Sequence, residues 1–364
     1  MLAAMLRTVP GEFVVDDVAL QATAEREVLI ETAAAGLCHS DLHYSQGLLK
    51  RPLPVVMGHE GAGVVLEVGS NVTNVSPGDR VVVCPSSCRK CPECWQGRPQ
   101  RCTGKASLQG PGGSRLHGAS GETVYQASDL GTFAERMLVH DSSVIAVPDG
   151  VSLELAAVMG CAVTTGLGAV FNTARVKAGE TVAVIGCGGI GLNIVQAAVI
   201  AGARQVIAID TQSSKLAMAT DFGATDVIDA SSTDPVASVL DLTNGGVDHA
   251  FEAVGRAEST RQAWQMLATF GTATVAGVLP ADTELRLPAE ALLREVRLQG
   301  CYMGSSQFAI DLPRYFSLYR QGRLKVDELV SKRYELTAIN DGYADLLAGS
   351  LARGVLVFPS AGSL

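Results

Sequence analysis

Residues 181–191 read TVAVIGCGGIG, an apolar strand that runs directly into the glycine pattern G-x-G-x-x-G at Gly186, Gly188 and Gly191. A helix that begins at such glycines offers free backbone N–H groups to a pyrophosphate, and larger side chains would block the approach. Asp210 ends the next strand, QVIAID, where its carboxylate can accept hydrogen bonds from ribose hydroxyls. We therefore predict a Rossmann-type dinucleotide site that prefers NAD, because the carboxylate would repel the 2′-phosphate of NADP.

The segments around this strand predict two kinds of domain. Across residues 163–303, apolar strands such as HAFEAVG and TATVAGV alternate with helical segments, which is typical of a parallel sheet wound by crossover helices. Across residues 1–162, short Val-rich runs alternate with Gly and Pro turns, which predicts a mostly antiparallel β region. Residues 304–364 contain helical stretches around 312–320 and 339–347, and we expect this tail to pack back on the first region.

Four cysteines lie close together in a predicted lobe at residues 84–103, in the segment CRKCPECWQGRPQRC. They are Cys88, Cys91, Cys94 and Cys102. This C-x2-C-x2-C-x7-C spacing is typical of a closed structural zinc site with four thiolate ligands. Two disulfides are the alternative, but two-residue gaps make poor bridging pairs and nothing else in the sequence indicates secretion. We predict a structural zinc ion.

A second set of residues with metal-binding side chains lies in GLCHSDLHYSQG, MGHEGAGVV and MGCAVTTG. The set comprises Cys38, His39, Ser40, Asp41, His43, His59, Glu60 and Cys161. Two thiolates and one imidazole are a known ligand set for a catalytic zinc that keeps its fourth position open for substrate. The residues alone leave the point open, because a lone Cys or His is more often a packed core residue.

Taken together, these motifs resemble the zinc-dependent alcohol dehydrogenases of the medium-chain dehydrogenase/reductase superfamily. GHEGAGVV, C-x-S-D-x-H, the cysteine lobe, the glycine motif and GC-x-x-T-T-G stand in the family's order over nearly the whole chain. The resemblance implies a GroES-like catalytic domain beside the Rossmann domain. It also implies NAD, two zinc ions per chain, and the reversible oxidation of primary alcohols to aldehydes. The length of segment 107–130 is that of the family's dimeric classes, so we expect a homodimer.

The resemblance assigns roles to the second set of residues. Cys38, His59 and Cys161 would bind the catalytic zinc, and Glu60 would lie beneath it as an occasional ligand. Asp41 would orient His59 through the other ring nitrogen. Ser40 would hydrogen-bond the substrate oxygen, and His43 would pass the proton on to solvent.

The same resemblance implies the cofactor contacts. Thr165 would contact the nicotinamide and Arg353 the pyrophosphate. The other expected contacts are Gly189, Ile190, Lys215, Val254 and Val278. Lys215 is either a second ribose contact or a solvated helix lysine. His39 stands where many relatives carry an arginine, so it either grips the pyrophosphate in a pH-sensitive way or faces solvent.

Three small residues stand at positions where relatives have larger side chains that line the alcohol pocket. These are Cys84, Ala127 and Ser128. Smaller walls predict a pocket for bulky primary alcohols, aromatic or branched, although Cys84 could instead be an inert buried thiol. Glutathione-dependent oxidation of formaldehyde, as S-hydroxymethylglutathione, is the alternative, with Arg115 as a candidate for binding a glutathione carboxylate.

Charge and hydropathy exclude several classes of function. A net charge of −9 leaves no basic field for a nucleic acid. The uncharged stretch 181–203 has the length of a membrane span, but its glycines make it a strand, a turn and a buried helix. The apolar run before Arg7 and Pro10 is too short for a signal peptide, so we expect a cytoplasmic enzyme without a membrane partner.

Overall fold

The computed structural model describes residues 1–349 and 351–359, and the structural statements below refer to these residues. The chain divides into two compact units. The first unit comprises Met1–Cys161, Gln307–Gly322 and the described residues from Val326 onward, and the second comprises Ala162–Ser306 and Arg323–Lys325. The predicted segments end at residues 162 and 303, close to these divisions. Each unit is described by itself.

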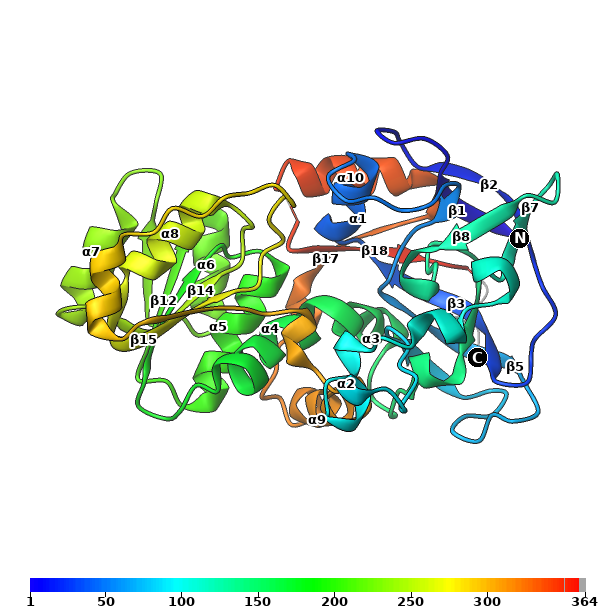
Figure 1. Ribbon diagram of the computed structural model, residues 1–364, viewed down its shortest axis with the longest axis horizontal. Helices are drawn as coiled ribbons and strands as arrows, with labels where there is room; N and C mark the ends of the chain where they lie inside the picture. The colour runs from blue at the N-terminus through cyan, green and yellow to red at the C-terminus, as the bar shows by residue number, and fades with distance from the viewer. Residues whose placement is uncertain (350, 360–364) are drawn as a thin grey trace. The chain divides into compact units, whose positions relative to one another are not determined.

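The first unit is built mainly from antiparallel strands (Figure 1). A closed barrel has the order β1 (Leu2–Leu6), β2 (Val14–Leu20), β7 (Leu116–Gly118), β8 (Thr123–Gln126) and β4 (Val55–Val56). A second sheet has the order β10 (Val144–Ala146), β6 (Arg80–Val83), β5 (Gly61–Val68), β3 (Glu27–Gly36), β18 (Arg353–Val357) and β17 (Val330–Tyr334), and β9 (Arg136–His140) also pairs with β3. The pairs β4/β8 and β17/β18 are parallel. The expectation of a mostly antiparallel first region is confirmed.

Five α-helices accompany these sheets in the described part of the first unit. They are α1 (His39–Ser45), α2 (Pro92–Trp95), α3 (Leu153–Val158), α9 (Phe308–Arg320) and α10 (Ile339–Leu347). On α10, Ile339, Tyr343 and Leu346 are buried in a core cluster with Leu37 and Phe133. The spacing of these three residues places them on one face of the helix, which explains why the tail can be buried against the β region.

The second unit is a six-stranded parallel sheet with helices packed against it (Figure 1). The order is β13 (Asp226–Asp229), β12 (Gln205–Asp210), β11 (Thr181–Ile185), β14 (Val247–Glu252), β15 (Leu267–Val275) and β16 (Arg297–Gly300). The connecting helices are α5 (Gly189–Ala201), α6 (Ser213–Asp221), α7 (Pro235–Thr243) and α8 (Ala257–Gln265). The chain order reverses between β11 and β14, and ligands of such sheets bind beyond the carboxyl ends of the strands at this point. The predicted parallel sheet is confirmed.

One helical run, Leu153–Ala174, has the length and apolar composition of a membrane span. Its most apolar window is 89% buried inside the protein, as in the core helix of a globular domain. The run includes α4 (Thr164–Gly168) and two π-helical turns, Met159–Val163 and Ala169–Ala174. Such turns are frequent at functional sites, and the first of them contains Cys161. The other apolar stretch, 181–203, forms β11, the glycine turn and α5, as its glycines predict.

Candidate active site

Four metal-binding side chains converge inside the first unit. The ligand atoms of Cys38, His59, Glu60 and Cys161 all lie within 4.8 Å of one another. Cys38 stands at the N-cap of α1, His59 and Glu60 directly precede β5, and Cys161 lies in the π-helical turn after α3. Two sulfurs and one imidazole nitrogen are the kind of donors that hold a catalytic zinc ion, so these residues fit the ion that the sequence predicts.

Asp41 fixes the orientation of His59. Its carboxylate lies 3.2 Å from Nδ1 of His59 and accepts a 3.1 Å hydrogen bond from the N–H of Gly58. Although burial of His59 disfavours its charged form, the negative charges of Asp41 and Cys38 raise the pKa of the imidazole well above its usual range. Because Nδ1 faces Asp41, Nε2 of His59 is the nitrogen left for a metal ion.

The two thiols of this cluster differ in acidity. A hydrogen bond with Cys161 lowers the pKa of Cys38 well below its ordinary value, and the positive charge of His59 acts in the same direction against the effect of burial. The same hydrogen bond and burial raise the pKa of Cys161. The cluster therefore holds at least one thiolate ready for a cation, because the thiolate is the form that binds metal.

Glu60, a member of this cluster, is paired with Arg353. The guanidinium donates a short hydrogen bond to Oε1 of Glu60, and both side chains are buried. Burial raises the pKa of Glu60 to about 7, and the charge of Arg353 opposes this rise. The structure thus places Arg353 against a carboxylate, and its expected contact with a pyrophosphate stays a prediction.

Helix α1 brings Ser40 and His43 close to the metal-binding cluster. They are three residues apart, so they lie on neighbouring positions of one helix face, and Oγ of Ser40 lies 3.6 Å from Sγ of Cys38. Burial lowers the pKa of His43 and so favours the neutral imidazole. The charge of Cys38 opposes this effect. His39, the first residue of α1, is exposed.

The glycine turn of the second unit is shaped for close approach of a ligand. A Cβ on Gly191 would lie 1.7 Å from the carbonyl oxygen of Gly186, whereas a Cβ on Gly188 would meet open space. Helix α5 begins at Gly189 and Ile190, so its free N–H groups lie at this opening. The turn therefore fits the pyrophosphate of a dinucleotide.

Asp210 stands at the carboxyl end of β12 with its carboxylate held by backbone. One oxygen accepts a 2.8 Å hydrogen bond from the N–H of Cys187 in the glycine turn, and the other accepts from Thr211 and Gln212. Val254 and Val278 follow β14 and β15 and are 44% and 40% exposed, which leaves apolar surface beyond the ends of these strands. The other expected contacts in this unit are Thr165, which is buried on α4, and Lys215, which is half-buried on α6.

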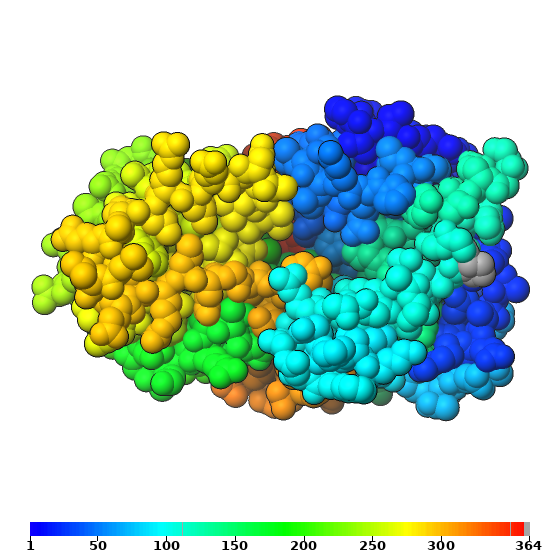
Figure 2. Space-filling view, in the orientation of Figure 1, coloured from blue at the N-terminus to red at the C-terminus, as the bar shows by residue number. Residues whose placement is uncertain are grey.

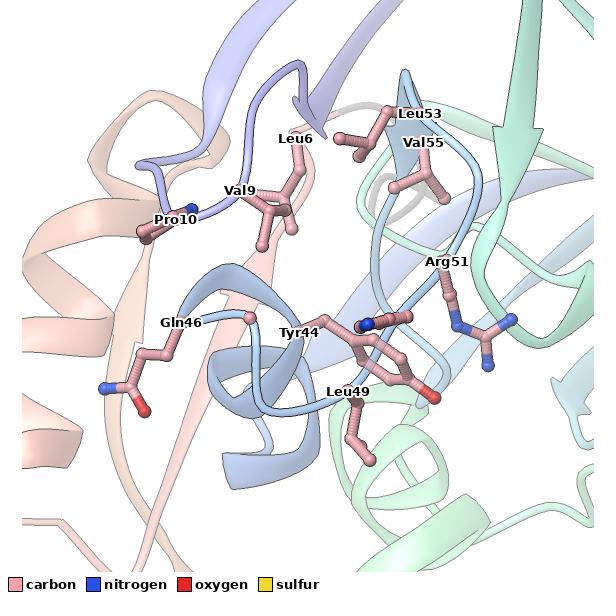
Figure 3. A pocket seen from close by; sticks show the side chains of 11 residues that line it. Leu6, Val9, Pro10, Tyr44, Gln46, Leu49, Arg51, Leu53 and Val55 are labelled. Carbon is pink, nitrogen blue, oxygen red and sulfur yellow. The ribbon is translucent and has the colours of Figure 1, made fainter. Parts of the chain in front are cut away.

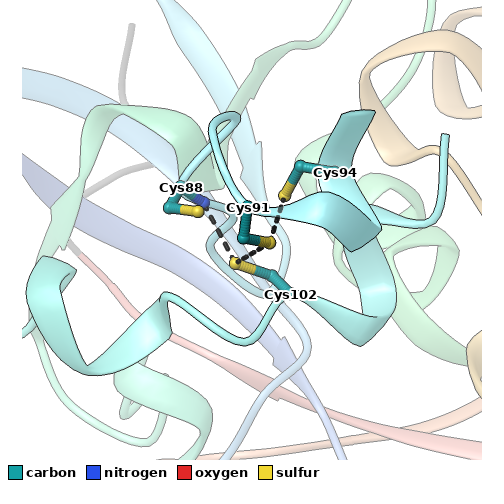
Figure 4. A group of neighbouring side chains, drawn as sticks. All are labelled: Cys88, Cys91, Cys94 and Cys102. Atoms are coloured by element: carbon teal, nitrogen blue, oxygen red, sulfur yellow. Dashed lines mark hydrogen bonds between the residues drawn. The ribbon is translucent and has the colours of Figure 1, made fainter. Parts of the chain in front are cut away.

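The cysteine lobe forms a second cluster, at the surface of the first unit (cyan in Figure 2). The four sulfur atoms of Cys88, Cys91, Cys94 and Cys102 lie within 4.8 Å of one another (Figure 4). Cys91 Sγ is 3.5 Å from that of Cys94 and 3.8 Å from that of Cys102. A tetrahedral zinc with Zn–S bonds of about 2.3 Å separates its sulfurs by about 3.8 Å. The lobe therefore fits a zinc ion.

The alternative of two disulfides is wrong. All nine cysteines of the sequence, every one in the described part of the chain, are free thiols. Sulfur separations of 3.5 Å and more are far beyond a covalent S–S bond of about 2.05 Å. A hydrogen bond from the backbone N–H of Cys94 lowers the pKa of Cys91 to about 5, which favours a thiolate ligand.

The three predicted walls of the alcohol pocket differ in exposure. Cys84 and Ala127 are each 2% exposed, and burial raises the pKa of Cys84 to about 12, which keeps it an inert thiol. Ser128 is half-buried, with a left-handed backbone at φ 55°, and its hydroxyl accepts a 3.5 Å hydrogen bond from Arg51.

Arg115, a candidate for binding a glutathione carboxylate, is not available for that role. Its side chain is buried, and its Nε donates a 2.6 Å hydrogen bond to the carboxylate of Glu27. Its Nη2 donates to the carbonyl oxygen of Leu108. An exposed loop arginine could have bound a ligand, but Arg115 forms an internal ion pair with Glu27.

Sequence reasoning missed one buried residue near the first cluster. Tyr343 of α10 stacks on Phe13 with ring centroids 4.7 Å apart. Burial and the negative charges of Asp41 and Cys38 raise the pKa of its phenol well above the usual range. Its spacing on α10 indicates only a core position, so the sequence carries no signal for its place beside these residues.

Comparisons with known proteins cover both units. The family described as "Alcohol dehydrogenase GroES-like domain" matches residues 24–149, and "Zinc-binding dehydrogenase" matches residues 189–317. Among curated relatives, the NDMA-dependent alcohol dehydrogenase of Amycolatopsis methanolica is 40% identical over 98% of each chain. The S-(hydroxymethyl)glutathione dehydrogenase of Saccharomyces cerevisiae is 34% identical over 94% of this chain and 92% of its own.

Solved structures agree with these relatives over nearly the full length. An alcohol dehydrogenase zinc-binding domain protein from Burkholderia ambifaria has a TM-score of 0.94 at 34% identity, with 98% of each chain covered. Benzyl alcohol dehydrogenase from Acinetobacter calcoaceticus has a TM-score of 0.93 at 30% identity, with 98% of this chain and 99% of that chain covered. Because the family models and these relatives match nearly the whole sequence, this chain belongs to the zinc-dependent alcohol dehydrogenases of the medium-chain dehydrogenase/reductase superfamily.

Proposed function

We propose that this alcohol dehydrogenase uses NAD to oxidise bulky primary alcohols to aldehydes, reversibly, at a centre held by Cys38, His59 and Cys161. The observation that carries the proposal is the convergence of these three ligands within 4.8 Å, with Glu60 beside them. When bound, zinc supplies a Lewis acid for the alcohol oxygen and NAD supplies the hydride acceptor.

The side chains around this centre bind, orient and move the proton. Asp41 holds Nδ1 of His59 and so fixes the ring for metal binding. Ser40 lies next to the Cys38 sulfur, where its hydroxyl would accept the proton of the alcohol. His43, whose lowered pKa keeps it neutral, is the acceptor toward solvent. Glu60 and Arg353 keep the charge beneath the centre balanced.

The preference for NAD is supported by Asp210. Its carboxylate lies at the end of β12, beside the glycine turn to which it is hydrogen-bonded. A negative charge at that place attracts ribose hydroxyls and repels a 2′-phosphate. Gly186, Gly188, Gly189, Ile190 and Gly191 would hold the pyrophosphate. His39, Thr165, Lys215, Val254, Val278 and Arg353 remain proposed cofactor contacts.

The substrate class is supported by the small side chains of Cys84, Ala127 and Ser128 and by the likeness to a benzyl alcohol dehydrogenase. The likeness to S-(hydroxymethyl)glutathione dehydrogenases keeps that substrate as the competing candidate. The internal ion pair of Arg115 weighs against it, because the positive charge it would have offered is already used.

A substrate panel tests these proposals. Benzyl alcohol, ethanol, and formaldehyde with and without glutathione are assayed with NAD and with NADP. NDMA is added as a further acceptor, because one relative is named for its dependence on it. We expect the highest kcat/KM for benzyl alcohol with NAD. A higher kcat/KM for ethanol, or turnover that requires glutathione, would reject the proposed substrate class.

We propose two zinc ions per chain, a homodimer and a cytoplasmic location. Two separate donor clusters support the zinc count.

An exposed apolar surface supports the dimer. The strand β16 is an edge strand of its sheet, and Phe270, Leu292 and Leu293 are 60%, 60% and 87% exposed. Free thiols persist in reducing compartments, which supports the location. Elemental analysis of zinc and light scattering in solution test the first two proposals.

A further inference from the structure

A cavity of about 440 Å³ lies in the first unit, between the N-terminal segment and the segment that follows α1. None of its lining residues belongs to the proposed zinc ligands, proton relay or cofactor contacts. Small-molecule sites have volumes of about 300 to 1,000 Å³, so this cavity is large enough for a ligand of its own.

One side of the cavity is apolar. Leu6 and Val55 lie on the neighbouring strands β1 and β4 and are fully buried, while Val9 and Leu53 complete this side (Figure 3). Leu53 is 37% exposed, so the apolar surface reaches solvent. This side can hold a hydrocarbon chain or ring.

The other side is positively charged. Lys50 and Arg51 both line the cavity, and its lining, all within the described residues, contains no carboxylate. The Arg51 guanidinium carbon lies 4.6 Å from the ring centroid of Tyr44, which holds the cation in place (Figure 3). Among the residues that the structure describes, the guanidinium makes one long hydrogen bond, 3.5 Å to Ser128, and its Nε is shielded from water and has no hydrogen-bond partner.

We propose that this cavity binds a small amphipathic carboxylate, with its apolar chain against Leu6, Val9 and Val55 and its carboxylate on Arg51. A planar carboxylate is the acceptor that best matches a guanidinium, and Nη2 of Arg51 is engaged only by the long hydrogen bond to Ser128 among the described residues. Lys50 adds a second positive charge to the lining of the cavity. A neutral amide of the same shape can accept one hydrogen bond from Arg51 through its carbonyl oxygen, but it lacks the negative charge and the second acceptor oxygen.

Calorimetric titration of the zinc-loaded full chain with octanoate tests the proposal, with octanamide as the neutral ligand of the same shape. We expect octanoate to bind about tenfold more tightly, the difference that a charge-assisted hydrogen bond provides. Arg51→Gln should abolish that difference. Leu53→Trp, a substitution at a partly exposed position that fills the cavity, should weaken both ligands. Arg136→Gln removes the same charge from an exposed position on β9 and should leave the affinities for octanoate and octanamide unchanged.

Activity is compared in Leu53→Trp rather than in Arg51→Gln, because Arg51 donates a hydrogen bond to Ser128, a proposed residue of the alcohol pocket. Leu53→Trp should oxidise benzyl alcohol like the wild type, and octanoate should not compete with that alcohol. Equal affinities for octanoate and octanamide would overturn the proposal. So would octanoate binding that survives both Arg51→Gln and Leu53→Trp, because the carboxylate would then be bound elsewhere, the catalytic centre included.

Discussion

Glu60 and Arg353 form an ion pair although 293 residues separate them, and both side chains are almost entirely shielded from water. Glu60 precedes β5 and Arg353 begins β18, and both strands pair with β3, so the sheet brings the two charges together. The carboxylate of Glu60 lies within 4.8 Å of the ligand atoms of Cys38, His59 and Cys161, where an unbalanced charge would disturb the proposed metal centre.

Replacing Arg353 by methionine should therefore destabilise the protein strongly. Loss of one partner from a buried ion pair costs about 3 to 5 kcal/mol, because the other charge stays buried without compensation. Urea unfolding measures the change. The double variant Glu60→Gln/Arg353→Met removes both charges and should recover part of the lost stability. If the single and double variants unfold alike, the ion pair does not account for the effect.

Removing a proposed zinc ligand or the proposed proton acceptor should abolish turnover but not cofactor binding. Cys38→Ala and Ser40→Ala change only the first unit, whereas the glycine turn lies in the second. Steady-state oxidation of benzyl alcohol and NADH fluorescence titration separate the two effects. Cys301→Ala, a thiol substitution in the second unit, should keep its turnover. Robust activity in either first-unit variant would reject the assigned centre.

The lowered pKa of His43 predicts a pH dependence of stability. Burial disfavours the charged imidazole in the folded state, so the unfolded chain binds a proton more readily. Stability should therefore fall as pH decreases from about 6.5, the ordinary histidine value, toward the lower folded pKa. Unfolding free energies of wild type and His43→Asn, measured from pH 8 to pH 5, check this. The difference between the two proteins should change with pH, and a constant difference would contradict the prediction.

Local patterns predicted more of this molecule than contacts between distant segments did. The strand, glycine turn and helix at 181–201 follow from neighbouring residues alone, and so does the four-cysteine lobe. The ion pairs of Arg353 and Arg115 could not be predicted from neighbouring residues, because their partners lie 293 and 88 residues away in the sequence. Arg115 lies in a loop that is polar in sequence, and only the position of Glu27 on β3 explains its burial.

A methyl group at Gly104 should release the zinc of the cysteine lobe. A Cβ built there lies 2.6 Å from Sγ of Cys88 and 3.9 Å from that of Cys102, so the ligand sulfur must move. Elemental analysis of Gly104→Ala should give about one zinc per chain in place of two, because the closed site needs all four thiolates. The Cβ of Gly300→Ala meets open space, so this control should keep both ions. Full zinc content in Gly104→Ala would show that the lobe tolerates the displacement.

Asp210→Asn should weaken the preference for NAD over NADP. The substitution keeps the side-chain size but removes the charge that repels a 2′-phosphate. Two charges about 4 Å apart near a protein surface interact by about 1 to 4 kcal/mol, so the ratio of kcat/KM for NAD to that for NADP should fall at least about fivefold. Asp226→Asn makes the same change at the opposite end of the adjacent strand β13, where it pairs with Ile207, and should leave the ratio unchanged. An unaltered ratio in Asp210→Asn would mean that the carboxylate serves only the backbone N–H groups of Cys187, Thr211 and Gln212.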